Sequence, residues 1–285
     1  MKIAVILSAH NRREKTLTCL TALFVCTLPS EAKLTVYITD DGSTDGTSAS
    51  VNSSFPQVTI LKGDGNLFWN GGMRLAFGEA LKEGYDYYLW LNDDTVLMPE
   101  AISFLLNTEH IVLDDSGKLG IIVGSTRDET TGELTYGGKN RRRWWLPQYL
   151  YVDEPGDIPK QCETMNGNCV LIPDEVAKCV GNLDPIFVHS MGDGDYGYRA
   201  RYAGFKLWIA PGYIGYCSRN TMFHLSKSDQ SSVLASLKRV CEPKAVPPNA
   251  WYHYTKRHYG FFWPIFCFLP YAMAIFRALR AKFSS

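Results

Sequence analysis

Excess charge of either sign is lacking in this sequence. Basic residues (lysine and arginine) and acidic residues (aspartate and glutamate) number 29 each, and together they make up 20% of the chain. This balance gives no electrostatic basis for a nucleic-acid partner. The 46% of apolar residues is typical of a packed globular protein rather than a disordered one. The 285 residues are enough for one large domain, or for one domain with an appendage.

The eight cysteines lack the spacing of a zinc site or a disulfide framework, because none belongs to a C-x-x-C pair. Free thiols in a reducing compartment are expected instead. The apolar run KIAVIL near the N-terminus lacks the length of a membrane-spanning helix, and no signal-peptide cleavage pattern follows it. It is predicted to be a buried first strand, so the body of the protein is expected to be cytoplasmic.

Internal repeats and low-complexity tracts are also missing, and strand-like and helix-like segments alternate through the first half. Strands are predicted at 3–8, 34–39, 58–62 and 87–91, helices at 14–24 and 73–83, and a Gly/Asn-rich loop at 63–72. This alternation predicts βαβ units and a mainly parallel α/β sheet flanked by helices. Ligands of such sheets bind at the carboxyl ends of the strands, where the acidic turns at 40–41 and 92–94 fall.

The second half of the chain is less regular. Residues 127–160 form an irregular excursion, and predicted structure resumes at 169–172, 184–204 and 206–210. The composition changes again after about residue 225. We therefore expect a main domain at 1–225 and a C-terminal helical extension at 226–285.

Asn92, Asp93 and Asp94 directly follow the apolar strand YYLWL. Acidic side chains clustered at a strand end are costly unless a cation is present. Their hard oxygen atoms suit Mg²⁺ or Mn²⁺, which would also neutralise a diphosphate. The alternative is a solvated turn, or an N-cap for a helix that begins near Pro99.

A second acidic segment, DDGSTDGT at 40–47, consists of residues that turns favour. Any α/β protein could carry such a turn. The functional interpretation is that Asp40 or Asp41 accepts hydrogen bonds from a nucleotide base or ribose.

The segment HSMGDGDYGYRARYAG at 189–204 places two carboxylates ahead of a short amphipathic helix. Asp193 lies in a Gly-flanked turn, where a carboxylate can approach a substrate hydroxyl as a general base must. Asp195, Arg199 and Arg201 could orient that base or bind phosphate. The alternative is a Gly-Asp turn that caps the helix.

The three acidic segments occur in the order found in one known family, and the chain resembles the family 2 glycosyltransferases of the GT-A fold over roughly residues 2–225. The family's opening pattern is matched by Ala9-His10-Asn11-Arg12, its Asp-Asp-Gly-Ser-x-Asp-Gly motif by residues 40–46, and its Asn/Gly segment by GNLFWNGGMRLAFGEAL at 65–81. Within the family the chain looks closest to rhamnosyltransferase-like enzymes of bacterial cell-surface polysaccharide assembly.

The resemblance implies a nucleotide-sugar site beside a metal site. Asp40 would contact the nucleotide base, Asp41 would support the loop, and Trp69 would stack on the acceptor or close over the donor, with simple packing as the alternative for Trp69. The implied donor site comprises Ala9, Asn11, Arg13, Asp40, Asp41, Asn66, Trp69, Gly71, Asn92, Asp93 and Arg199.

The family's Asp-x-Asp motif falls on Asn92-Asp93-Asp94. Asp94 is therefore the expected direct ligand of Mn²⁺ or Mg²⁺, with Asn92 and Asp93 holding ribose or metal-bound water. His224 would complete the metal site, although a single histidine can equally be a hydrogen-bonded structural residue.

The family's catalytic motif usually reads Glu-Asp, and it is Gly192-Asp193 here. The resemblance implies an inverting single displacement at the anomeric carbon of a nucleotide-diphosphate sugar, with Asp193 as the base and Asp195 as its substitute. The implied acceptor is a saccharide or a lipid-linked saccharide.

Other activities make different demands on the sequence. A nucleotidyltransferase would need a Gly-rich phosphate loop where SAHNRREK has no glycine, and a Rossmann dehydrogenase would need a G-x-G-x-x-G pattern after the first strand. A catalytically inactive sugar- or lipid-binding domain stays open as an alternative, because acidic residues are missing at 92 and 192.

The C-terminal run 261–276 is almost wholly apolar, but Pro264 and Pro270 interrupt it and it is shorter than the ~20 residues of a spanning helix. Aromatic and basic residues in and around this run predict an interfacial segment that lies in one leaflet, at the inner face of the plasma membrane. A helix packed on the core or on another subunit is the alternative. The aromatic and basic residues are Tyr259, Trp263, Tyr271, Arg277, Arg280 and Lys282.

Overall fold

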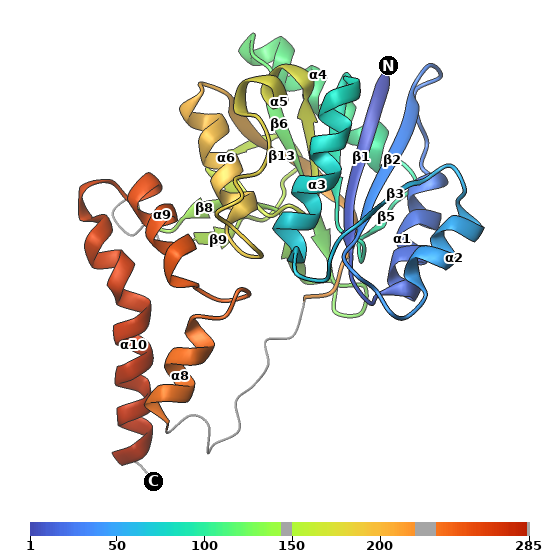
Figure 1. Ribbon diagram of the computed structural model, residues 1–285. Coiled ribbons are helices and arrows are strands. Elements are labelled where there is room, and N and C mark those ends of the chain that lie inside the picture. The colour runs from blue at the N-terminus through green and yellow to red at the C-terminus, as the bar shows by residue number, and fades with distance from the viewer. Residues whose placement is uncertain (144–149, 220–231, 284–285) are drawn as a thin grey trace.

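The structure is a computed structural model that describes residues 1–143, 150–219 and 232–283 (Figure 1). Its strands are β1 (Lys2–Ala9), β2 (Lys33–Asp40), β3 (Thr59–Lys62), β4 (Tyr87–Leu91), β5 (Val96–Leu97), β6 (Gly120–Arg127), β7 (Leu134–Tyr136), β8 (Gly138–Arg141), β9 (Leu150–Val152), β10 (Lys160–Cys162), β11 (Thr164–Met165), β12 (Cys169–Pro173) and β13 (Lys206–Tyr216). Its helices are α1 (Arg13–Phe24), α2 (Thr47–Ser54), α3 (Phe68–Glu83), α4 (Ala101–Ser116), α5 (Asp174–Val180), α6 (Gly192–Tyr202), α8 (Val233–Val240), α9 (Pro248–His258), the 3₁₀ turn η1 (Gly260–Phe262) and α10 (Trp263–Phe283).

The centre of the molecule is a 10-stranded sheet in the order β10-β13-β6-β12-β4-β1-β2-β3, with β5 paired to β13 and β7 to β6. In the first half, β1 pairs in parallel with both β2 and β4, and β3 pairs in parallel with β2. The register sets Ala9 beside Asp40. The carboxyl ends of β1, β2 and β4 therefore meet at one edge, and the two acidic turns leave the sheet there. The expected mainly parallel α/β fold is confirmed.

The second half adds antiparallel strands to this sheet. Strand β12 lies between β4 and β6 and is antiparallel to both, whereas β13 is parallel to β6. Part of the irregular excursion forms a small second sheet in the order β11-β8-β9. This sheet brings residues 138–141 and 164–165 close to the carboxyl-end edge of the main sheet, so the excursion contributes a wall of the site described below.

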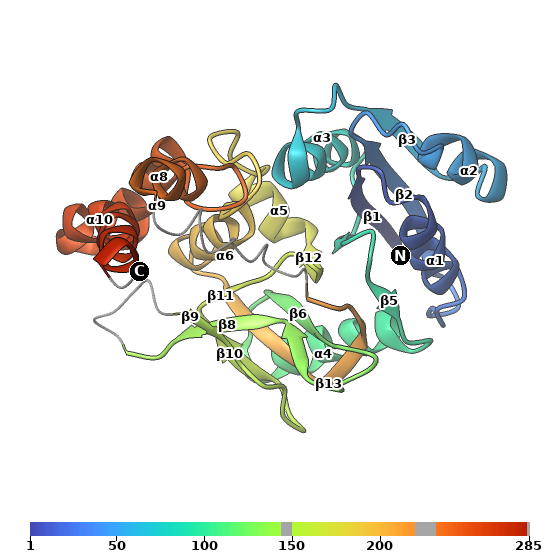
Figure 2. The same cartoon turned by 90° about the horizontal axis from the view of Figure 1, so that it is seen from below.

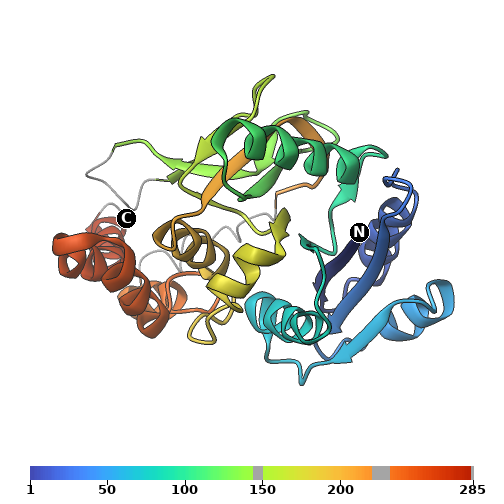
Figure 3. The ribbon, with the colours of Figure 1, turned by 90° about the horizontal axis from the view of Figure 1, so that it is seen from above.

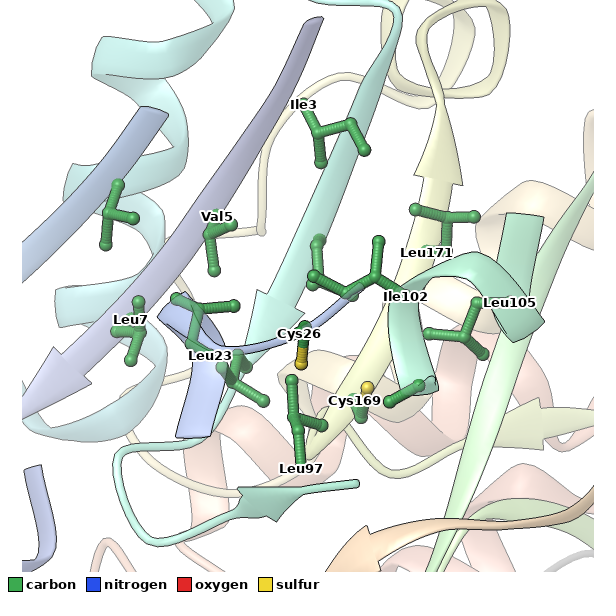
Figure 4. Close-up of a cluster of buried hydrophobic side chains, with 14 of the residues drawn as sticks. Ile3, Val5, Leu7, Leu23, Cys26, Leu97, Ile102, Leu105, Cys169 and Leu171 are labelled. Carbon is green, nitrogen blue, oxygen red and sulfur yellow. The ribbon is translucent and has the colours of Figure 1, made fainter. Parts of the chain in front are cut away.

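Helices bury both faces of the sheet, which explains why β1 reads as a nearly continuous apolar run. Figure 4 shows one face, where Ile3, Val5 and Leu7 of β1 meet Leu23 of α1 and Ile102 of α4. The opposite side chains of β1 pack against α3, α5 and α6, which Figure 3 shows on the other side of the sheet from α4. Complete burial of each such aliphatic side chain stabilises the fold by about 1.5–3 kcal/mol.

Helix α3 begins at Phe68, five residues before the predicted start, so the predicted loop at 63–72 is partly helical. The cause is a tertiary contact, because the Asp41 carboxylate accepts the Phe68 N–H at 2.8 Å. A carboxylate at this position satisfies a free N–H group at the helix N-terminus and favours the helix dipole. Gly72 then lies against Ser8 so closely that a Cβ atom would stand 2.0 Å from the serine Oγ.

The C-terminal segment folds into α8, α9, η1 and α10 beside the α/β body. Helices α8 and α10 run side by side and extend past that body, while α9 packs on α6 (Figures 1 and 2). The predicted interruption by prolines is wrong, since α10 is one helix of 21 residues. Pro264 lies in its first turn, where no helical N–H is needed, and Pro270 is accommodated inside.

The prediction that this apolar segment is too short to span a membrane is also wrong. The stretch Gly260–Ala281 covers 22 residues, long and apolar enough to cross a membrane, and only 11% of its most apolar window is buried in the protein. Several large apolar side chains of this stretch are exposed to solvent, namely Phe261, Phe262, Ile265, Phe268, Met273, Phe276 and Leu279.

Candidate active site

A cavity of about 530 Å³ lies at the carboxyl ends of β1, β2 and β4. The chain reaches it from both halves and from the segment before α9. Its walls include Ser8, Ala9, His10, Arg12, Asp41, Gly65, Phe68, Trp69, Asn92, Asp93, Tyr136, Lys139, Asn166, Gly167, Asn168, His189, Ser190, Met191, Asp193 and Lys244. Six residues of the predicted site thus meet here: Ala9, Asp41, Trp69, Asn92, Asp93 and Asp193.

The turn after β2 is held by its own two aspartates. The Asp40 Oδ1 atom accepts the Ser43 N–H at 3.0 Å. Asp41 accepts the Gly65 N–H through Oδ1 and the Phe68 N–H through Oδ2, both at 2.8 Å. Both carboxylates are buried. Asp41 therefore has the loop-supporting place expected of it, and Asp40 lies behind the cavity surface in the same turn.

Trp69 and Asn92 form one wall of the cavity. The indole Nε1–H of Trp69 donates to the Asn92 Oδ1 atom at 2.7 Å. The ring also lies against the backbone of Gly167, where a Cβ atom would stand 2.6 Å from it. The hydrogen bond uses the oxygen that Asn92 would offer to a metal ion, so this geometry does not favour Asn92 as a ligand. Trp69 is therefore fixed by two contacts and lines the cavity.

Asp93 and Asp94 converge on the guanidinium of Arg12. The Arg12 Nη1 atom donates to Asp93 Oδ1 at 2.9 Å and to Asp94 Oδ2 at 2.8 Å. Burial, reinforced by the Asp94 charge and opposed by the Arg12 charge, raises the pKa of Asp93 to about 6. Two carboxylates already arranged around one cation are hard oxygen donors of the kind that Mg²⁺ and Mn²⁺ take, so the pair fits a divalent ion. In this structure the cation beside the two carboxylates is the Arg12 guanidinium.

Of the other metal ligands predicted from the sequence, Asn92 has its side-chain oxygen on Trp69, and His224 lies outside the described residues. Within 1–143, 150–219 and 232–283, no group of three or more His, Cys, Asp or Glu side chains is arranged to hold a metal ion. Besides Arg12, Asp94 contacts Cys217, whose Sγ lies 3.5 Å from Asp94 Oδ1. Asp94 itself lines a smaller adjoining cavity of about 250 Å³.

The arginine that reaches the site is Arg12, not the predicted Arg13. Asn11 has a φ of +51°, a left-handed conformation that asparagine tolerates, and the chain turns there between β1 and α1. Arg13 consequently lies outside the cavity wall, with its backbone N–H on Asp45 and its guanidinium on Glu14. Asn11 itself accepts the Thr44 N–H and steadies the turn after β2.

Two further predicted donor residues, Asn66 and Gly71, are not part of the cavity wall. Asn66 is exposed, and its N–H donates to Asp64. Gly71 is inside α3, where it packs against Leu67. Both positions support the segment that carries Trp69 rather than contacting the cavity.

Asp193 occupies the first turn of α6 and lines the cavity. Its Oδ1 accepts the Gly194 N–H at 2.7 Å and its Oδ2 accepts the Gly167 N–H at 3.1 Å. The helix begins after Met191, whose φ of +75° turns the chain into it. These two backbone donors fix the orientation of the carboxylate. The side chain is half-buried and lines the cavity, so an acceptor hydroxyl can reach it.

The glycine that replaces the family's glutamate has a local explanation. A Cβ atom at Gly192 would stand 1.7 Å from the Oδ1 of Asn70. Asn70 comes from α3, is fully buried, and donates to the carbonyls of Phe187 and Asp184 at 2.5 and 3.1 Å. The asparagine fills the space that a side chain at position 192 would need, so Asn70 and Gly192 fit together as a pair.

Asp195 and Arg199 are structural partners rather than cavity residues, which corrects two predictions. Asp195 is completely buried and bonds to Arg199 at 2.8 Å, to His258 at 2.9 Å and to Arg257. Burial opposes its ionisation, but the hydrogen bonds from His258 and Arg199 and the charges of Arg199 and Arg257 hold its pKa below the usual value. With its oxygens engaged in this way, Asp195 cannot replace Asp193 as a base.

Several cavity residues were not found from the sequence. His189, Lys139 and Lys244 add basic groups to the wall, and Lys244 comes from the C-terminal extension. Burial and the nearby Lys244 ammonium lower the pKa of His189. In the sequence, the position of His189 just before the Asp193 turn was the one indication of a place in the cavity wall. Nothing in the sequence indicated such a place for Lys244, because its position depends on how the C-terminal extension packs against the segment before α6.

Comparisons with known proteins identify the family of this chain. The model of the family described as glycosyl transferase family 2 matches residues 4–181. No curated protein sequence matches this chain. The mannosyltransferase PcManGT from Pyrobaculum calidifontis, solved with GDP-Man and Mn²⁺, has a similar structure, with a TM-score of 0.54 and 15% identity over 98% of this chain and 73% of that chain.

Two structures of TarS from S. aureus are also similar. TarS 1–349 in complex with UDP-GlcNAc has a TM-score of 0.58 and 13% identity over 96% of this chain and 82% of that one. A longer TarS chain has a TM-score of 0.56 and 14% identity over 99% of this chain, which spans 50% of its length. At these identities the structures show a shared fold, and the family match covers most of the chain. The chain belongs to glycosyl transferase family 2 and is a glycosyltransferase.

Proposed function

We propose that this glycosyltransferase is a metal-dependent inverting enzyme with Asp193 as its catalytic base. Its donor in this proposal is a nucleotide-diphosphate sugar, and its acceptor is a saccharide or lipid-linked saccharide of cell-surface polysaccharide synthesis. Rhamnose is the sugar that the sequence resemblance favours. The observation that carries the proposal is the position of Asp193, which lines the same cavity as Asp41 and Asp93.

The chain's own groups divide the work between the two sides of the cavity. The nucleotide lies along the ends of β1 and β2, beside Ala9 and Asp41, and its diphosphate meets the basic groups of Arg12 and Lys244. A divalent ion held by Asp94 and Asp93 would supply Lewis-acid screening of the leaving diphosphate. Trp69 places the sugar between these two sides.

Asp193 accepts the proton of the acceptor hydroxyl as that oxygen forms a bond to the anomeric carbon. The bond between the anomeric carbon and the diphosphate oxygen breaks on the opposite face, which inverts the configuration. The N–H groups of Gly167 and Gly194 hold the carboxylate in place for this step. Fixed geometry and placed charge are the main contributions of the protein.

The alternative of an inactive binding domain rested on the missing acidic residues. At position 192 a larger side chain has no room, because Asn70 fills the space that it would need. At position 92 the asparagine has a defined partner in Trp69. Neither departure disturbs Asp193.

Membrane attachment is part of the proposal. The exposed apolar side chains of α10 have no covering among the described residues, and a lipid surface at the cytoplasmic face would bury them. Helices α8 and α10 carry basic groups suited to anionic lipid, namely Lys238, Arg239, Arg277 and Arg280. An enzyme held there would meet a lipid-linked acceptor directly.

Replacement of the base tests the reaction. Asp193→Asn keeps the size of the side chain and removes its basicity, so sugar transfer should fall by about 10²–10⁴-fold. Donor binding, measured by thermal shift across a panel of nucleotide sugars with Mn²⁺, should stay within about twofold of wild type. The matched control is Asp157→Asn, an exposed carboxylate outside the cavity wall. Near-normal turnover by Asp193→Asn would rule out Asp193 as the base.

A further inference from the structure

Arg12 lies at the start of α1 with its guanidinium placed between two buried carboxylates. The side chains of Asp93 and Asp94 are only 6% and 5% exposed, whereas that of Arg12 is 31% exposed. The two aspartates are neighbours in the chain, so their charges would repel strongly in this buried position without a cation between them. Arg12 supplies that cation from within the chain.

A divalent ion held between the two carboxylates would compete with Arg12 for Asp93 Oδ1 and Asp94 Oδ2. Coordination of Asp93 Oδ1 and Asp94 Oδ2 by Mg²⁺ would require contacts of about 2.0–2.1 Å. The Arg12 Nη1 atom is already 2.9 and 2.8 Å from these oxygens, so a metal ion and the guanidinium cannot occupy the position together. Electrostatic repulsion between the two cations adds to the steric conflict.

The cavity gives the guanidinium another partner. Arg12 is part of the cavity wall as well as of the ion pair, and its partly exposed side chain faces the space where the donor diphosphate is expected. A guanidinium binds phosphate oxygens with two parallel hydrogen bonds. These bonds would replace the hydrogen bonds to the two aspartates that Arg12 loses when it moves away.

We propose that Arg12 is a tethered counter-ion that occupies the metal position of the Asp93–Asp94 pair, and that a divalent ion displaces it toward the donor diphosphate. Metal binding alone is then weak, because it must break two charged hydrogen bonds. Metal and diphosphate bind cooperatively, since the diphosphate stabilises the displaced arginine and each ligand strengthens the other by the same factor. The diphosphate part of this inference rests on the proposed function.

The test is Mn²⁺ binding to the full-length protein, followed by electron paramagnetic resonance of the free ion. Without nucleotide, Arg12→Gln should bind Mn²⁺ about tenfold or more tightly than wild type, because the competing charge is gone. Arg13→Gln is the matched control, with the same charge change one residue along and its guanidinium on Glu14, and should leave the affinity unchanged. Addition of UDP or GDP should tighten Mn²⁺ binding by a larger factor in wild type than in Arg12→Gln.

Unchanged or weaker Mn²⁺ binding by Arg12→Gln would overturn the inference, as would equal nucleotide coupling in the two proteins. Arg12→Lys keeps the charge and guards against a folding defect, and it should bind Mn²⁺ within about threefold of wild type. If Arg12→Lys bound Mn²⁺ as tightly as is expected for Arg12→Gln, the positive charge of residue 12 would not be what Mn²⁺ competes with, and the inference would be wrong. These measurements need no turnover, so they are independent of the Asp193→Asn result that tests the proposed function.

Discussion

The fit between Gly192 and Asn70 leads to a quantitative prediction for Gly192→Ala. The added Cβ would stand 1.7 Å from Asn70 Oδ1, so the atoms must separate by about 1.7 Å to reach ordinary contact. Asn70 is fully buried and cannot move without weakening its bonds to Phe187 and Asp184. Loss of two hydrogen bonds costs about 1 kcal/mol each, and overpacking costs about 1–3 kcal/mol.

The free energy of unfolding should therefore fall by about 3–5 kcal/mol. On the scale for large domains this corresponds to a drop in melting temperature of about 6–20 °C. Differential scanning calorimetry gives the shift, and urea unfolding gives the free energy. Gly156→Ala is the control, because its added Cβ would meet no atom closer than 3.9 Å and its φ is not positive.

A double mutant separates this contact from other effects of the glycine. The Asn70 Cβ is 3.4 Å from the added Cβ, which is ordinary contact. Gly192→Ala should therefore cost less than about 1 kcal/mol in an Asn70→Ala background. A melting temperature of the single variant within about 2 °C of wild type, or full additivity in the double variant, would refute the reasoning.

Two further predictions concern α6 and α10. Asp195→Asn should lower the free energy of unfolding at neutral pH by about 1.5–3 kcal/mol, because the partly exposed Arg199 and Arg257 lose their counter-charge and buried His258 loses a charged hydrogen-bond acceptor. Since the folded-state pKa of Asp195 is lowered, its stabilisation is present above the unfolded pKa and is lost as pH falls through the folded one, so the difference between variant and wild type should shrink in acid titrations followed by circular dichroism. On α10, Phe268→Glu with Phe276→Glu should reduce co-sedimentation with anionic vesicles without lowering the melting temperature, since these rings are 71% and 66% exposed. Val25→Glu, at a residue 66% exposed on the α/β body, is the control, and retained vesicle binding by the double variant would exclude α10 as the membrane contact.

Local sequence patterns predicted much of the fold. The predicted strand at 87–91 is β4, and the predicted strands at 3–8 and 34–39 lie within β1 and β2. Apolar runs of strand length followed by acidic turns were sufficient, because burial on both faces of a parallel sheet leaves few other arrangements for such runs. The same reasoning placed Asp41 and Asp93 at one edge of the sheet, and the family order of the motifs added Asp193, which lines the same cavity.

Features that depend on partners distant in the chain were not predictable in this way. The early start of α3 depends on Asp41, which lies 27 residues before Phe68. Asp195 likewise bonds to Arg257 and His258, which lie 62 and 63 residues further along the chain. Residue spacing cannot reveal either contact.

The sequence by itself determined the order of strands and acidic turns, and hence the edge of the sheet where the chemistry takes place. Only the tertiary structure decided which side chains are available there. It turned Arg12 rather than Arg13 toward the aspartates, engaged Asp195 in buried ion pairs, and left Asp193 facing the cavity. The physical reason is that hydrogen bonds and charge pairing depend on side-chain positions within about an ångström, and packing between distant elements sets those positions.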